Sequence, residues 1–141
     1  MKTNQIYLVK DSFSLVLQIP AEVIGELFYK RLFEIAPEIR PIFDHTAIKE
    51  QYNQLSAMLA YIVKRLHILE TIKDEIAKLT YHHLKYGIVE YRLNESVGEA
   101  LLWTIEQGLG SHWNKEVKTA WAVCYLMFSN AMIEACEAIE V

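Results

Sequence analysis

The apolar residues of this chain recur at spacings of three and four, the period of an α-helix, along most of its length. The alternation of apolar and polar residues that marks β-strands is nowhere sustained. Three prolines and five glycines interrupt the helical pattern only at intervals. The sequence therefore predicts an all-α protein whose helices turn their apolar faces toward a shared core.

Two helices are predicted in the first third of the chain. The first runs from about Asn4 to Gln18, and Pro20 starts the second, which ends near Ala36. Proline suits the first turn of a helix, because the N–H that it lacks would have no partner there. A short helical turn, PEIRPIF, follows and ends near Phe43, since a proline inside it prevents a longer helix.

Four further helices are predicted in the remainder. They run from about Ile48 to Leu66, from near Ile72 to His83, from about Glu95 to Leu109, and from Asn114 through the apolar positions that end at Ala135.

Helix boundaries are marked by four small or polar residues. Gly87 and Gly110 stand where a helix is expected to stop, because glycine accepts the left-handed backbone of a C-terminal cap. Asn94 and Asn114 stand where an N-cap is expected, since their side chains can accept from free backbone N–H groups.

Length and composition narrow the class of protein. With 141 residues, 52% of them hydrophobic, we expect one domain over residues 1–141 with a sizeable core. A net charge of −4, with basic residues spread along the chain, argues against nucleic acid or an anionic membrane as partner. No apolar run has the length of a signal peptide or of a membrane span. We therefore expect a cytoplasmic protein.

Candidate chemistry centres on residues 79–102, LTYHHLKYGIVEYRLNESVGEALL. His83 stands in the last turn of a predicted helix, and Gly87 follows four residues later. An imidazole at that place can project into the interior and bind a metal through its neutral nitrogen. A helix C-terminus also favours histidine as a capping or surface residue, so the position alone leaves both interpretations open.

Two polar side chains stand on apolar helix faces. Tyr29 lies in the second helix, where either its ring packs and its hydroxyl reaches the surface, or its hydroxyl faces a bound ligand. Gln51 precedes Leu55 by one turn on the same face of the third helix. An amide on that face either stays solvated at the rim or finds an interior partner.

These residues together resemble the globin family. The resemblance rests on His83-x-x-x-Gly87-Ile88, PEIRPIFD at Phe43, FYKRLF at Tyr29, EQYNQL at Gln51, Val97-Gly98-Glu99 before Leu101-Leu102, and Ala120-Trp121 with Tyr125. The sequence is most similar to single-domain bacterial haemoglobins of the Vitreoscilla type, and resembles the globin part of flavohaemoglobins and neuroglobin. The likeness extends from about Ile6 to Ala138.

The resemblance implies a globin fold, a three-over-three helical sandwich around one haem b (iron protoporphyrin IX). It implies that His83 is the metal ligand on the proximal side. On the distal side it implies Tyr29, Gln51 and Leu55 as ligand-binding residues, with Glu50 as the alternative to Gln51. The other residues that it places against haem are Phe43, Leu55, Ile88, Val97, Leu101, Tyr125 and Phe128.

Further positions carry alternatives that the resemblance leaves open. No histidine stands at the distal place, although His45 is a minor candidate for a second iron ligand. Partners for the haem propionates are sought among Lys49, His82 and Arg92. His67 and His112 are expected at the surface.

The function implied by the resemblance is the binding of dioxygen or another diatomic gas, nitric oxide or carbon monoxide, for storage, delivery or sensing. An alternative is nitric-oxide dioxygenase activity with a separate reductase, because the chain ends at Val141 without a fused flavin domain. Asn94 and a position near Cys136 stand where flavohaemoglobins have a tyrosine and a glutamate around the proximal histidine, and Tyr91 and Glu137 are the neighbours in an alternative register. The first register favours ligand binding over a dedicated enzyme. A third alternative is a haemless signalling module. Monomer and homodimer both stay open.

Overall fold

The computed structural model describes residues 2–43, 48–67 and 91–140, and within these ranges the chain forms five α-helices and no strand. The all-α prediction is confirmed for these residues. The elements are α1 (Thr3–Val16), α2 (Ala21–Ile35), η1 (Pro37–Phe43), α3 (Ile48–Lys64), α5 (Tyr91–Leu109), η3 (Gly110–His112) and α6 (Lys115–Glu140), where η marks a short 3-10 helix.

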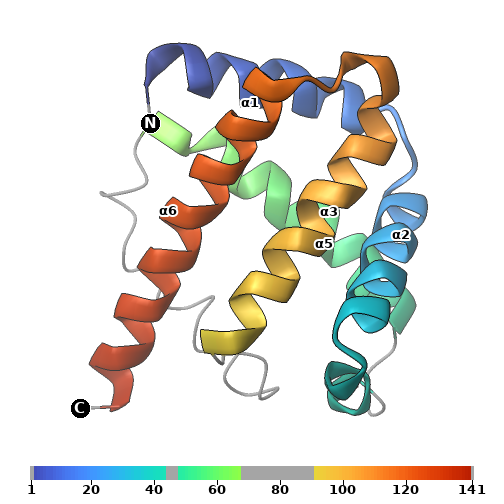
Figure 1. Ribbon diagram of the computed structural model, residues 1–141, viewed down its shortest axis with the longest axis vertical. Coiled ribbons are helices and arrows are strands. Elements are labelled where there is room, and N and C mark those ends of the chain that lie inside the picture. The colour runs from blue at the N-terminus through green and yellow to red at the C-terminus, as the bar shows by residue number, and fades with distance from the viewer. Residues whose placement is uncertain (1, 44–47, 68–90, 141) are drawn as a thin grey trace.

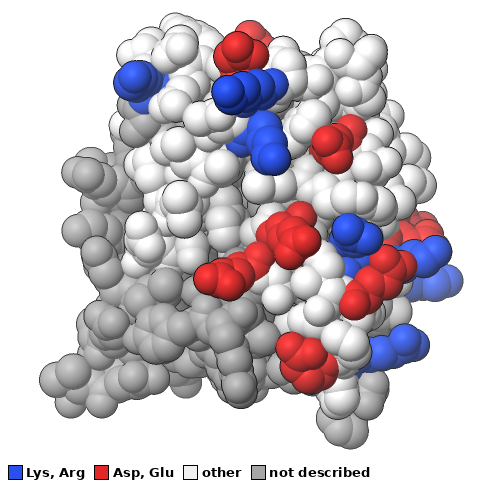
Figure 2. Space-filling model, viewed as in Figure 1, with Lys and Arg blue, Asp and Glu red and all other residues white. Residues whose placement is uncertain are grey.

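The helices cross in two layers. Figure 1 shows α5 and α6 running side by side, with α3 crossing behind them and α1 lying over one end. In the packing, α2 lies against both α3 and α5, and α1 lies against both α6 and α5. Among the described helices, none is both long and apolar enough to cross a membrane. In the same view, charged side chains of both signs are interspersed among the described residues (Figure 2).

Three predicted boundaries are confirmed. Helix α2 begins directly after Pro20. Gly110 ends α5 with φ at +53°, in the left-handed region that glycine adopts without a steric penalty. The backbone N–H of Val117 donates a 2.9 Å hydrogen bond to Oδ1 of Asn114, which is an N-cap bond for α6.

One predicted boundary is wrong. Helix α5 begins at Tyr91 rather than near Glu95, so Asn94 lies inside the helix and is not its N-cap. The residues between Tyr91 and Glu95 include neither proline nor glycine, and an asparagine inside a helix costs only about 0.7 kcal/mol relative to alanine. Extending an existing helix adds one backbone hydrogen bond for each residue fixed, which offsets that cost.

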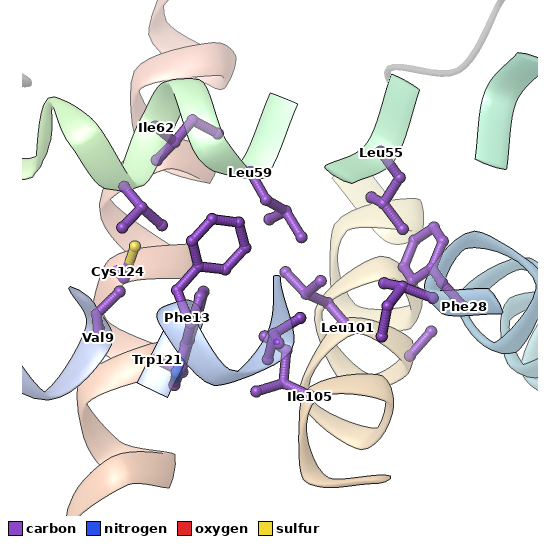
Figure 3. Packing of buried hydrophobic residues seen from close by; sticks show 14 of the residues in the cluster. Val9, Phe13, Phe28, Leu55, Leu59, Ile62, Leu101, Ile105, Trp121 and Cys124 are labelled. Atoms are coloured by element: carbon purple, nitrogen blue, oxygen red, sulfur yellow. The ribbon is translucent and has the colours of Figure 1, made fainter. Parts of the chain in front are cut away.

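The core is a single cluster of buried apolar side chains from all five helices. At one end Phe13 of α1 meets Trp121 of α6 edge-on, with ring centroids 6.1 Å apart. At the other end Phe28 of α2 lies beside Leu55 of α3 (Figure 3). Leu59, Leu101 and Ile105 lie between these two groups (Figure 3). The core therefore reaches from the α1–α6 contact to the α2–α3 contact. The candidate site lies at the α2–α3 contact.

Candidate functional site

Tyr29 lies on α2 among three other aromatic rings. Its ring centroid is 5.0 Å from that of Phe28, 6.1 Å from that of Phe33 and 5.7 Å from that of Tyr52. Phe28 and Phe33 belong to the same helix, whereas Tyr52 belongs to α3. Tyr29 is only 9% exposed. The tyrosine is therefore held by its own helix and by the helix that crosses it.

The protonation of Tyr29 follows from this burial. Removal from water disfavours the phenolate, and the neighbouring Tyr52 adds to that effect, so the pKa of Tyr29 rises from 10.0 to about 12. At neutral pH its hydroxyl is a neutral hydrogen-bond donor.

The crossing of α2 and α3 is set by a glycine. A Cβ atom at Gly25 would lie 2.3 Å from Cα of Tyr52 and 2.6 Å from its carbonyl oxygen, closer than any real Cβ contact. Only a residue without a side chain lets the two backbones approach this closely. Gly25 and Tyr29 are one helical turn apart, so this contact fixes where the residues around Tyr52 lie relative to Tyr29.

The predicted distal residues of α3 differ in exposure. Gln51 is half-buried, whereas the alternative Glu50 and the neighbouring Lys49 are exposed. Leu55, one turn after Gln51, is buried at 5% exposure. Tyr29, Gln51 and Leu55 therefore come from the two helices that meet at the Gly25 crossing.

Helix α5 supplies further predicted residues. Leu101 is buried, and in Figure 3 it lies between the Phe13–Trp121 group and the Phe28–Leu55 group. Val97, one turn earlier, is half-buried and packs against the same cluster. The apolar side chains predicted on α3 and α5 thus belong to one core.

Helix α6 contributes Tyr125 and Phe128. Phe128 is buried and Tyr125 is half-buried. A Cβ at Gly98 would lie 2.6 Å from Cε1 of Tyr125, so the tyrosine ring lies directly on the α5 backbone. Burial raises the pKa of Tyr125 to about 12, although hydrogen bonds with Ser129 and with the Gly98 backbone act in the opposite direction.

Several predicted site residues lie outside the described part of the chain. These are His83, the predicted metal ligand, together with Ile88, His45 and His82. The backbone of Phe43 ends η1, but its side chain lies outside the description, as do the side chains of Arg92 and Cys136. His67 and His112 are exposed, as predicted.

Gly25 and Tyr52 were missed by sequence reasoning. A glycine inside the apolar second helix was the available signal, because an isolated helical glycine often marks a close packing contact. The sequence does not indicate which residue this glycine contacts, because that residue lies on another helix.

Comparison with known proteins supports the same fold. A family model named Globin matches residues 26–132. The chain is similar to the structure of a bacterial globin from Campylobacter jejuni, with a TM-score of 0.84, 23% identity and 99% of each chain covered. The predicted globin fold is therefore confirmed.

Relatives in sequence include anaerobic nitrite reductases and flavohemoproteins. An anaerobic nitrite reductase of Arabidopsis thaliana is 31% identical over 137 residues, which cover 86% of this chain and 85% of that protein. Flavohemoprotein B of Dictyostelium discoideum is 23% identical over 135 residues, which cover 96% of this chain but only 31% of that protein. With the family model matching most of its length, the chain belongs to the globin family.

Proposed function

We propose that this globin, as a single domain over residues 1–141, binds one haem b through His83 and holds a diatomic gas, dioxygen above all, on the opposite side. The observation that carries the proposal is the buried Tyr29 at the α2–α3 crossing. When bound, haem supplies an iron that coordinates such gases. The residues of the chain decide how firmly the gas is held.

The described residues suit the faces of a porphyrin. Leu55, Leu101 and Phe128 are buried apolar side chains from three different helices, all in one cluster. Apolar walls exclude water from a porphyrin ring, and a neutral phenol can stand among them without the cost of a buried charge. These apolar side chains and the neutral phenol therefore support haem as the bound group.

Tyr29 is proposed to donate a hydrogen bond to the held gas. Haem would polarise a bound dioxygen, and a hydrogen bond from Tyr29 to a charged group would contribute about 1.5–3 kcal/mol. That range corresponds to roughly tenfold to a hundredfold in affinity. Gln51 is proposed as a second donor in preference to Glu50, because Gln51 is half-buried and Glu50 is exposed.

The distal proposal is tested with Tyr29→Phe, which removes the hydroxyl and keeps the ring. We expect the dissociation rate of dioxygen, followed by stopped-flow absorbance, to rise roughly tenfold or more. Tyr61→Phe on α3 is the matched control, because Tyr61 packs against Arg65, with the guanidinium carbon 3.9 Å from its ring. An unchanged rate in Tyr29→Phe would refute the role of Tyr29.

The cofactor proposal is tested separately with His83→Ala. We expect the purified variant to lose the Soret band, because the proposed iron ligand is gone. His112→Ala, a change at an exposed histidine, should keep the band. A wild-type protein that takes up no haem would instead support the haemless signalling alternative.

A second candidate function is nitrite reduction, which is favoured by the names of relatives such as the Arabidopsis thaliana protein. Reduction of nitrite to nitric oxide and water consumes one electron and two protons. With a pKa of about 12, Tyr29 is a good hydrogen-bond donor but a poor proton donor at neutral pH.

Nitrite reduction is tested without oxygen, with excess nitrite and a chemical reductant. Nitric oxide produced in several equivalents per haem would establish turnover, and production limited to one equivalent would reject it. Nitric-oxide dioxygenase activity is tested by nitrate yield when nitric oxide is added to the oxygenated protein with an external reductant.

A further inference from the structure

We propose that Tyr52 is a positioning residue whose ring sets the orientation of Tyr29 and so links the distal hydrogen bond to the position of α3. The inference rests on the proposed function, because it concerns the same hydroxyl. Tyr52 itself is not proposed to touch the gas.

The three rings around Tyr29 come from two different helices. Phe28 and Phe33 lie on α2 with Tyr29, so they move together with it. Tyr52 lies on α3, and its ring is tilted by 34° to that of Tyr29 at a centroid distance of 5.7 Å. Offset aromatic pairs at this separation attract one another beyond simple burial. Of these three rings, only that of Tyr52 can hold Tyr29 relative to α3.

The backbone under Tyr52 has little freedom to shift. A Cβ atom added at Gly25 would lie only 2.3 Å from the Cα of Tyr52, so the two backbones are already in close contact. The ring of Tyr52 therefore extends from a backbone already pressed on α2, toward a tyrosine one helical turn beyond Gly25. A side chain anchored in this way restricts its neighbour more than one on a free helix would.

The same contact connects the two proposed distal donors. Gln51 directly precedes Tyr52 in α3, and Tyr29 contacts the ring of Tyr52. A displacement of α3 would therefore change the positions of Gln51 and Tyr29 together. The ring of Tyr52 therefore keeps Tyr29 and Gln51 in a fixed relative position, because it joins the two helices that carry them.

The first test compares Tyr52→Leu and Tyr52→Phe. Leucine removes the flat ring, so we expect dioxygen to dissociate about threefold to tenfold faster, whereas phenylalanine keeps the ring pair and should stay within about twofold of wild type. Tyr61→Leu is the matched control, a half-buried tyrosine on the same helix that packs against Arg65. An unchanged rate in Tyr52→Leu would overturn the proposal.

The double variant Tyr29→Phe/Tyr52→Leu separates positioning from a general structural effect. Without the Tyr29 hydroxyl, Tyr52 has no donor left to orient. The dissociation rate of dioxygen in the double variant should therefore match that of Tyr29→Phe alone. Rate increases that multiply would overturn the inference. A Tyr29→Phe variant without effect would instead refute the proposed role of Tyr29 in holding the gas, so the two failures are distinguishable.

Two spectroscopic measurements do not depend on gas release. The stretching frequency of carbon monoxide bound to the ferrous protein reports the donor near the ligand, so it should shift in Tyr52→Leu and return in Tyr52→Phe. In the wild-type carbonyl protein, nuclear Overhauser contacts should join the rings of Tyr29 and Tyr52. Their absence would overturn the proposal even if Tyr52→Leu failed to fold.

Discussion

The indole Nε1 of Trp121 donates a 2.9 Å hydrogen bond to Oγ of Ser12, and both residues are buried. The Ser12 hydroxyl in turn donates to the carbonyl oxygen of Leu8, one turn earlier in α1, at 2.6 Å. Ser12 therefore acts as acceptor and donor at once, and it connects the first helix to the last. Without it, the indole N–H would lie unpaired in an apolar core, beside the edge-on contact of Trp121 with Phe13.

Ser12→Ala should therefore destabilise the protein. The change leaves a buried indole donor without its acceptor, which costs about 1–3 kcal/mol. Chemical denaturation followed by circular dichroism would measure the difference in unfolding free energy. Ser14→Ala is the matched control, because Ser14 is on the same helix and its hydroxyl makes only an exposed bond to the carbonyl oxygen of Asp11. Equal effects of the two changes would contradict the importance of the Trp121 bond.

Gly25→Ala should destabilise the fold although alanine is the better helix former. The change gains about 1 kcal/mol in helix propensity. It also forces a methyl group against the backbone of Tyr52, and overpacking of this kind costs about 1–3 kcal/mol, with backbone atoms least able to move. We expect a net loss of stability in thermal denaturation and faster dioxygen release, since α2 and α3 must separate.

Gly108→Ala is the comparison for that change. A Cβ at Gly108 would meet Cδ1 of Ile19 at 3.2 Å, and this atom is the end of a side chain that can adjust. Gly108→Ala should therefore be close to neutral. If both alanine variants had the same stability, the close crossing at Gly25 would not be the cause.

Asn114→Ala should loosen the start of α6. It removes the acceptor of the 2.9 Å bond from the backbone N–H of Val117, and loss of an N-cap costs about 1 kcal/mol. Hydrogen exchange should speed up at the first amides of α6 and stay unchanged in α2. Asn114→Asp should keep the wild-type exchange rates, because aspartate is as good a cap as asparagine.

Local signals predicted the boundaries best. Pro20, Gly110 and Asn114 act through their own backbone or side chain, so a single sequence reveals them. The predicted N-cap at Asn94 was wrong although it rested on the same kind of local signal. The cap preference of asparagine is real, but no proline or glycine stands between Tyr91 and Glu95, and each residue added to an existing helix gains a backbone hydrogen bond.

Only part of the candidate site could be predicted from the sequence. Helical spacing predicted that Leu55 and Leu101 would face the core, and both are buried. The contact between Gly25 and Tyr52 depends on how two helices cross, which the period of either helix does not contain. The resemblance to globins named His83, Ile88 and Phe43 as cofactor residues, and these roles stay predictions.

Alkaline pH should destabilise the protein through three acidic groups that are buried or half-buried. Burial raises the pKa of Tyr29 and of Tyr125 from 10.0 to about 12, and that of the Cys124 thiol from 9.0 to about 12. In each case the folded pKa lies above the unfolded value, so the folded state keeps its proton where the unfolded chain has lost it. This contribution to stability is complete below about pH 9 and is lost as the pH rises toward 12.

Urea unfolding midpoints measured between about pH 8 and about pH 11 would show this decline. Tyr29→Phe removes one titrating group and keeps its ring, so its curve should fall less steeply than that of the wild type. Tyr61→Phe removes the same hydroxyl from a tyrosine of α3 and controls for the substitution itself. Unfolding midpoints that stayed constant up to about pH 11 would mean that these three groups titrate alike in the folded and unfolded states, and that burial does not keep Tyr29 protonated.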